Sequence, residues 1–159
     1  MKPINNPFLK GHDYDCFGCA PHNPIGLALE FFEDGDEIVS EWKPREHFEG
    51  FKGVLHGGIQ AALHDEIASW VVFVKLGTAG YTQNLSLTYL APVMVAKGSI
   101  TLRSRLRDMD GNKASMVTTL FDGEGKACSE SLAVYFTVPV HIAKRMFDYP
   151  GKEAFQETV

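Results

Sequence analysis

Apolar residues recur at spacings of three and four along the stretch from Gly57 to Leu76. The residues that set this period are Ile59, Ala62, Leu63, Ile67, Trp70, Val71 and Val74. Such a period is typical of a helix that buries a broad apolar stripe. We therefore predict one long helix over this stretch, and we expect the glycines at positions 77 and 80 to end it.

Most of the remaining sequence alternates apolar and polar residues with a period of two, which indicates strands. Before the helix, residues 26–34 and 37–44 flank the turn Asp34-Gly35-Asp36, and we predict that they form a β-hairpin. After the helix, the predicted strands cover residues 84–93, 98–108, 113–122 and 127–138. The turn sequences MDGN and DGEG are expected to join the last three of them as hairpins.

This order places a single helix amid consecutive antiparallel strands, which predicts an α+β domain. A largely apolar helix buries most of its surface only when the concave face of the sheet wraps around it. Residues 1–26 contain several prolines and glycines and are expected to form an irregular N-terminal arm. Residues 27–139 are the predicted domain, and residues 140–159 are a predicted C-terminal tail with a short helix and a frayed end.

Composition and charge narrow the class of protein. The chain has 159 residues, of which 45% are hydrophobic and 22% charged, as in one soluble globular domain. The formal charge of −5 argues against nucleic-acid binding through a general positive surface. No apolar stretch approaches the roughly 20 residues that span a bilayer. Three cysteines are also too few for a disulfide framework, which agrees with a reducing compartment. Taken together, these features lead us to expect a cytoplasmic protein that binds neither nucleic acid nor membrane.

His56, Gly57 and Gly58 stand where the predicted helix begins. The first backbone N–H groups of a helix lack intrahelical partners and carry the positive end of its dipole, so they can bind an anion. Two residues without side chains also let a substrate carbonyl approach the main chain closely. The alternative is a plain tight turn before a helix.

Asp65 lies within the largely apolar helix, where an ionised carboxylate is costly. It follows His56 by nine residues, and nine steps of about 100° bring it to the opposite side of the helix. One helix therefore does not easily place both residues in the same site. The alternative is that Asp65 is a solvated residue on the helix edge.

The element order and these motifs together resemble the PaaI-like acyl-CoA thioesterases of the hotdog fold. The resemblance rests on His-Gly-Gly at the helix start, on the acid nine residues later, and on the strand sequence GYTQNLSLTYLAP. It covers residues 16–138, and the pieces CFGC, NPIGL and Glu49-Gly50 with Gly53 are similar to one branch of the family.

The resemblance implies an enzyme that hydrolyses the thioester between an acyl or aryl group and coenzyme A. It implies no metal, and no cofactor beyond the coenzyme A carried by the substrate. It also implies a homodimer, or a dimer of such dimers. In the family dimers two helices lie side by side and antiparallel, so the glycine of one subunit faces the acid of the other.

In that shared site the Gly57 N–H is expected to hold the oxyanion that develops when the thioester is attacked. Asp65 is expected to act as general base on a water or as the nucleophile itself, and both routes stay open. His56 ranks second as a catalytic residue, with an expected role in shaping the loop and hydrogen bonding near the carbonyl. Further contacts to substrate or nucleophile are expected from Gly58, Ser69, Thr82, Gln83 and Asn84.

Two neighbouring residues and one departure from the family bear on this assignment. Glu66 is a rival acid, but it lies one residue further round the helix and off the family position. His64 points about 100° away from Asp65, so we interpret it as a satisfied or exposed histidine. Many relatives have Asn or Gln six residues before the histidine, where this chain has Gly50, which leaves the polar contacts to the substrate open.

Two other groups of residues are compatible with binding chemistry. His12, Cys16, Cys19 and His22 form the pattern H-x3-C-x2-C-x2-H, which could supply zinc ligands or a redox pair. No second cysteine pair follows, so we interpret the cysteines as small apolar groups and expect no metal. Arg103, Arg105 and Arg107 share one strand face, which indicates a solvated surface or, as the alternative, a contact to coenzyme A phosphates.

The leading hypothesis is thus an acyl-CoA thioesterase. The runner-up is a non-catalytic acyl-CoA-binding hotdog module, which would need the glycine turn but no acid at position 65. A hotdog hydratase would carry its Asp-His pair in a different local pattern, and we do not find that pattern in this sequence.

Overall fold

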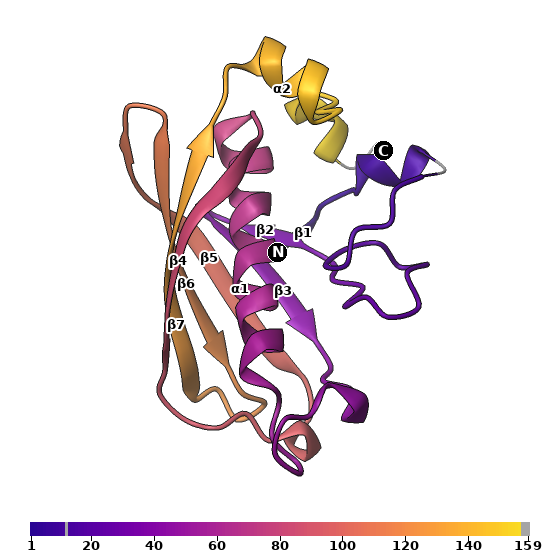
Figure 1. Ribbon diagram of the computed structural model, residues 1–159, viewed down its shortest axis with the longest axis vertical. Coiled ribbons are helices and arrows are strands. Elements are labelled where there is room, and N and C mark those ends of the chain that lie inside the picture. The colour runs from indigo at the N-terminus through magenta and orange to yellow at the C-terminus, as the bar shows by residue number, and fades with distance from the viewer. Residues whose placement is uncertain (12, 157–159) are drawn as a thin grey trace.

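One sheet and one long helix make up the body of the protein (Figure 1). The computed structural model describes residues 1–11 and 13–156. The strands are β1 (Lys2–Pro3), β2 (Phe32–Asp34), β3 (Glu37–Trp42), β4 (Gly80–Tyr89), β5 (Ile100–Asp110), β6 (Lys113–Phe121) and β7 (Ala127–Thr137). They form a seven-stranded sheet in the order β1-β2-β3-β5-β6-β7-β4, and every neighbouring pair is antiparallel. The predicted α+β class is confirmed.

Helix α1 (Gly57–Val71) runs along the concave face of this sheet and continues as a π-helical turn, Val72–Leu76. Gly77 ends it with a left-handed backbone, φ 69°, as the sequence predicts. Most of the predicted apolar stripe is buried, with Ile59 and Ala62 only partly so, and the Trp70 ring stacks on Phe31 with centroids 4.2 Å apart. Packing against strands on both sides of the sheet centre fixes the helix, and thus the residues that it carries.

His64 belongs to this core and not to a site. It is fully buried, and its ring nitrogens Nδ1 and Nε2 lie 2.7 and 2.9 Å from the hydroxyls of Ser131 and Ser129 on β7. Burial lowers the pKa of His64 to about 4, which keeps the ring neutral near pH 7. Of the two predicted alternatives, the satisfied histidine is the one observed.

The hairpin before the helix is shorter than predicted. Residues 27–31 are not a strand, because the Leu27 N–H donates to the Phe17 carbonyl and the Leu29 N–H to the Gly18 carbonyl of the N-terminal arm, while hydrogen bonds from β3 to this stretch come from side chains of that strand. Between them Ala28 has a positive φ of 53°, which interrupts an extended chain. The prediction of a strand from residue 26 is therefore wrong, and β2 starts at Phe32.

The N-terminal arm contains two short elements, strand β1 and a 3-10 turn at Pro7–Lys10. It packs on the domain, since Cys19 and Ala20 are buried. After β7 come α2 (Val140–Met146) and a 3-10 turn at Lys152–Phe155, and this last turn lies beside the arm in Figure 1. The Asn5 N–H donates to the Phe155 carbonyl at 3.0 Å, so the two ends of the chain cover the same side of α1.

Two further observations concern the outer surface. Strand β4 is at one end of the strand order, and it pairs only with β7 among the described strands. Most of its side chains are exposed. Separately, none of the described helices has both the length and the apolar character that crossing a bilayer requires.

Candidate active site

A pocket of about 850 Å³ opens at the N-terminal end of α1. Its walls come from the loop before the helix, from the first turn of the helix and from the segment after β4. The lining residues are Glu49, Gly50, Phe51, Val54, Leu55, His56, Gly57, Gly58, Gln60, Tyr89, Leu90, Ala91 and Pro92. The His-Gly-Gly turn and the Tyr-Leu-Ala-Pro segment, both singled out in the sequence, therefore meet at one pocket.

His56 caps the helix. Its Nδ1 accepts the Gly58 N–H at 2.8 Å, which satisfies one of the free donors of the first turn. The ring is then held against the turn, and a Cβ at Gly58 would lie 3.1 Å from it. This position agrees with a role in shaping the loop. A direct catalytic role of His56 stays a prediction.

Gly57 keeps its N–H free. Within the described chain this N–H donates to no acceptor, whereas the Gly57 carbonyl accepts the Tyr89 hydroxyl at 2.7 Å. A Cβ at Gly57 would lie 3.1 Å from the same hydroxyl, so the tight approach of Tyr89 is one reason for a glycine here. An unpaired N–H at a helix N-terminus, facing a pocket, is suited to stabilise an oxyanion.

Asp65 is held through one of its two carboxylate oxygens. Oδ1 accepts the Thr82 hydroxyl at 2.8 Å and the Tyr135 hydroxyl at 2.7 Å, while Oδ2 has no protein partner in the described part of the chain. Burial raises the pKa of Tyr135, with a further contribution from the Asp65 charge, so the phenol stays a donor. One oxygen thus fixes the carboxylate, and the other is available for chemistry.

Within one subunit Asp65 is separate from the pocket. It is not among the residues that line the pocket at Gly57. Asp65 follows Gly57 by eight residues, which separates the two by about 12 Å along the axis of α1.

Of the other predicted contact residues, some lie beside Asp65 and some do not. Thr82 binds Asp65, as expected from a hydroxyl near the nucleophile. Ser69 does not: its hydroxyl donates to the Glu66 carbonyl at 2.7 Å, a bond within the helix. Gln83 and Asn84 lie on the exposed edge strand β4, beside a register shift, and Asn84 accepts the Ser86 hydroxyl at 3.1 Å. Their contacts to substrate stay predictions.

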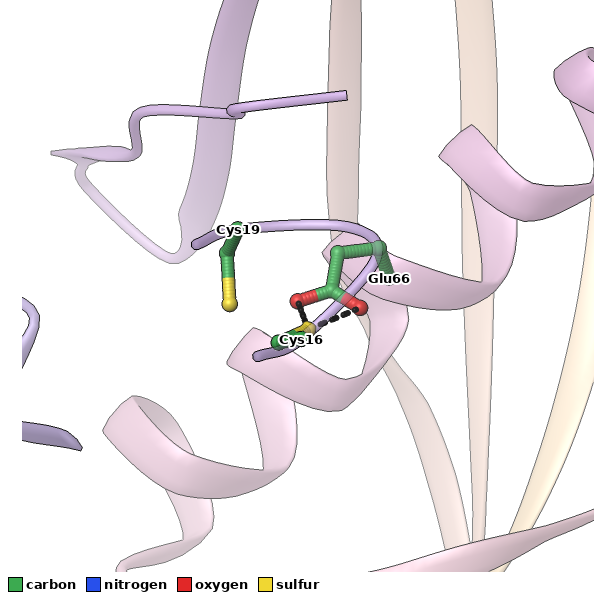
Figure 2. Close-up of side chains that lie close together, drawn as sticks. All are labelled: Cys16, Cys19 and Glu66. Carbon is green, nitrogen blue, oxygen red and sulfur yellow. Dashed lines mark hydrogen bonds between the residues drawn. The ribbon is translucent and has the colours of Figure 1, made fainter. Parts of the chain in front are cut away.

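Glu66, the rival acid, points towards the N-terminal arm (Figure 2). Its Oε1 accepts the Trp70 Nε1–H at 3.1 Å, and both of its carboxylate oxygens lie close to the Cys16 thiol. Burial raises the pKa of Glu66 to about 7. The two neighbouring acids therefore serve different parts of the molecule.

Two polar residues of the site were not identified from the sequence. Tyr135 is one, and the signal for it was its inward position in the alternation of the last strand. Gln60 is the other: it is 3% exposed and lines the pocket, yet its Oε1 has no partner among the described residues. Its Nε2 makes only a long bond of 3.4 Å to the Leu55 carbonyl.

The Gly50 departure has a steric reason. A Cβ at Gly50 would lie 3.3 Å from the His56 ring, so a longer side chain there would displace the helix cap. The Asn or Gln side chain that many relatives have six residues before the histidine is thus missing from this chain. The buried amide of Gln60 lines the same pocket as Gly50.

The arginine face is engaged in part within the protein. Arg103 pairs with Asp34 and Glu37 on the neighbouring strands, which is the behaviour of a surface ion-pair network. Arg105 and Arg107 are exposed. Of the H-x3-C-x2-C-x2-H pattern, His22 is exposed near Asp15 and apart from the cysteines, and His12 lies outside the described residues.

Solved structures share this fold. A thioesterase superfamily protein superimposes with a TM-score of 0.67 at 24% identity, over 73% of this chain and 57% of that one. A thioesterase from Haemophilus influenzae gives 0.64 at 23% identity, over 72% of this chain and 80% of the other. A hypothetical thioesterase from Streptococcus pneumoniae, solved with coenzyme A, gives 0.64 at 22%, over 70% and 87%.

At these identities the solved structures establish the fold alone, and the chain spans little more than half of the first of them. A search of curated proteins finds no match. A family comparison is more informative, because residues 52–129, which carry both the pocket turn and Asp65, match the thioesterase superfamily. Together the sequence match and the shared hotdog fold confirm the predicted resemblance: this chain belongs to the thioesterase superfamily.

Proposed function

We propose that this protein is an acyl-CoA thioesterase that hydrolyses an acyl- or aryl-coenzyme A to the free acid and coenzyme A. The observation that carries the proposal is the state of Asp65, whose carboxylate is fixed by Thr82 and Tyr135 through Oδ1 and is open at Oδ2. The Oδ2 atom can therefore take a proton from a water or attack a carbonyl carbon. The superfamily match supports thioester hydrolysis, and a structurally similar protein solved with coenzyme A supports coenzyme A as the carrier of the acyl group.

The proposed site is shared between two subunits of a homodimer. Asp65 lies about two turns after Gly57 on α1 and outside the pocket, so antiparallel helices of two subunits would bring the acid of one to the pocket of the other. The exposed edge of β4 offers unpaired backbone groups that a second copy can bind, which continues the sheet. Each dimer then holds two sites, and a pair of such dimers is the proposed larger assembly.

The proposed chemistry combines Gly57 of one subunit with Asp65 of the other. In one route Asp65 takes a proton from a water that attacks the thioester carbon; in the other Asp65 Oδ2 attacks this carbon directly and water later releases the acyl group. In both, the carbonyl oxygen becomes an oxyanion that accepts the Gly57 N–H. Collapse of the tetrahedral intermediate expels coenzyme A as a thiolate, which then takes up a proton.

Single turnover in oxygen-18 water distinguishes the two routes. Label that enters Asp65 in one turnover, with an unlabelled Asp65 oxygen in the product, identifies direct attack, because water must then have attacked the Asp65 carbon of an acyl anhydride. Attack of water on the thioester labels the product and never Asp65. Mass analysis of the peptide that contains Asp65 measures whether oxygen-18 has entered this residue.

The function is tested by free-thiol release from a panel of straight-chain and aryl acyl-CoA esters. Wild-type protein is expected to hydrolyse at least one ester, and Asp65→Asn is expected to abolish this activity while the fold is retained. Asp110→Asn, a change of an exposed acid at the β5–β6 hairpin, serves as the matched control. Acyl-CoA binding by wild-type protein without thiol release would instead identify the non-catalytic binding module.

A further inference from the structure

Three potential metal ligands from distant parts of the sequence meet on the arm side of α1 (Figure 2). Cys16 and Cys19 come from the N-terminal arm, and Glu66 comes from the middle of the helix. Their ligand atoms, two thiol sulfurs and a carboxylate oxygen, all lie within 4.8 Å of one another. The proposed hydrolysis uses none of them.

The arm is shaped around the Glu66 carboxylate. A Cβ at Gly18 would lie only 2.3 Å from the Glu66 carboxyl group, so a larger residue there would move this carboxyl group from its present position beside the Cys-Phe-Gly-Cys loop. Cys16 and Cys19 flank Gly18, which directs both thiols towards the same place. The loop thus forms a small cradle with three electron-rich groups.

The distances suit a tetrahedral zinc ion. The Cys16 sulfur lies 3.6 and 3.7 Å from the two carboxylate oxygens of Glu66. Zinc bonds of about 2.3 Å to sulfur and about 2.1 Å to oxygen at a tetrahedral angle separate the two ligand atoms by about 3.6 Å. The observed separation therefore already corresponds to two ligands on one ion.

The surroundings supply oriented donors but no positive charge. In the described residues no lysine or arginine pairs with Glu66. The Trp70 Nε1–H holds one carboxylate oxygen at 3.1 Å, and the Tyr14 hydroxyl lies 3.0 Å from the Cys19 sulfur. Such outer hydrogen bonds are typical of groups that orient metal ligands. Thiolates with a carboxylate also favour zinc over the harder Mg²⁺ and Ca²⁺.

We propose that Cys16, Cys19 and Glu66 bind one Zn²⁺ per chain, with a solvent molecule as the fourth ligand. Both thiols lose their protons to solvent when the ion binds, and the ion joins the arm to α1 at the residue after Asp65. The ion is a structural clamp, distinct from the hydrolytic site. This reverses the expectation of no metal, because the third ligand comes from the helix and is far from the cysteines in the sequence.

Cobalt(II) titration of the reduced, metal-free protein is the direct test. Wild-type protein is expected to bind one equivalent, to show thiolate-to-cobalt charge-transfer absorption, to release protons on binding, and to lose the absorption when Zn²⁺ is added. Cys16→Ser and Cys19→Ser are expected to weaken binding by more than about 100-fold, and Glu66→Gln by at least about tenfold. Cys128→Ser removes a buried cysteine elsewhere and is the matched control, expected to bind as wild type.

Wild-type protein alone provides a second measurement, in case the variants do not fold. Zn²⁺ is expected to protect Cys16, which is only partly buried, from alkylation by iodoacetamide, as located by peptide mass analysis. The proposal is overturned if folded, reduced protein binds neither ion, if binding survives in the double variant Cys16→Ser/Cys19→Ser, or if Zn²⁺ does not change the alkylation of Cys16. The cluster would then be a hydrogen-bonded contact only.

Discussion

Two buried or half-buried polar residues on the same helix differ in how their hydrogen-bonding capacity is used. Asp65 is bound on one oxygen by two hydroxyls and is open on the other. Gln60 is buried at the pocket with an oxygen that binds nothing in the described chain. Both arrangements leave an acceptor for a ligand, and the buried, unpaired Gln60 oxygen also costs stability, which is typical of residues kept for function.

We predict that Tyr135→Phe lowers kcat about tenfold or more and leaves KM nearly unchanged. The change removes one of two hydroxyls that orient the Asp65 carboxylate, and a hydrogen bond to a charged group contributes about 1.5 to 3 kcal/mol. Steady-state kinetics on the preferred ester measure the effect. A Tyr135→Phe enzyme with wild-type kcat would show that Thr82 alone is enough to position Asp65.

We predict that Gln60→Leu stabilises the protein while it impairs hydrolysis. Leucine has a similar volume and removes a buried oxygen without a partner, so the free energy of unfolding should rise by about 1 kcal/mol. Urea unfolding and thiol-release kinetics test the two parts. A loss of stability together with unchanged kinetics would assign Gln60 to the core instead of the substrate pocket.

At the scale of elements, local pattern predicted most of the fold. The long helix, its glycine end and the last three strands follow from period and turn residues, because these signals lie within each segment. The first strand after the helix is Gly80–Tyr89, four residues earlier than the predicted 84–93. The prediction of a strand over residues 27–31 was wrong because backbone N–H groups of this stretch donate to the N-terminal arm. The local pattern of residues 27–31 does not encode that contact. Tyr135 and the Cys16–Glu66 contact were likewise not predictable, since each depends on how two elements are positioned in space.

The C-terminal segment offers an element-scale prediction in alkaline solution. Tyr149 is buried and donates its hydroxyl to the Phe73 carbonyl at 2.9 Å, where the helix makes its π turn. Burial, with Glu153 as the lesser cause, raises the pKa of Tyr149 to about 12. Between the ordinary phenol pKa of about 10 and this value, the unfolded chain loses the proton and the folded chain keeps it, so stability falls as pH rises.

We therefore predict that Tyr149→Phe unfolds with a weaker pH dependence than wild type between about pH 10 and 12, by up to about 1.4 kcal/mol per pH unit. Below pH 9 the two proteins should show the same pH dependence, because the Tyr149 phenol is protonated in both the folded and the unfolded state. Urea unfolding across the range measures the slopes. Equal slopes in both proteins would mean that the Tyr149 phenol ionises in the folded state as it does in the unfolded one.

At the scale of the whole molecule, the subunit is half of the proposed enzyme. Gly57, with its free N–H, lines the pocket at the start of α1, and Asp65, with its open oxygen, lies about two turns further along the helix and outside the pocket. The exposed edge strand β4 provides the surface on which a second copy can continue the sheet. The central claim is that each thioester is held by Gly57 of one subunit and attacked with the help of Asp65 of its partner.

Subunit complementation tests this claim most directly. Asp65→Ala and Gly57→Val homodimers, each checked for folding by circular dichroism, are expected to be inactive, the second because a side chain blocks the oxyanion donor beside Tyr89. After mixing and subunit exchange, verified by native mass spectrometry, half of the dimers contain one intact and one doubly altered site, so about a quarter of wild-type activity should return. Verified heterodimers with no thioester hydrolysis would contradict the shared site and would require Asp65 to serve its own subunit.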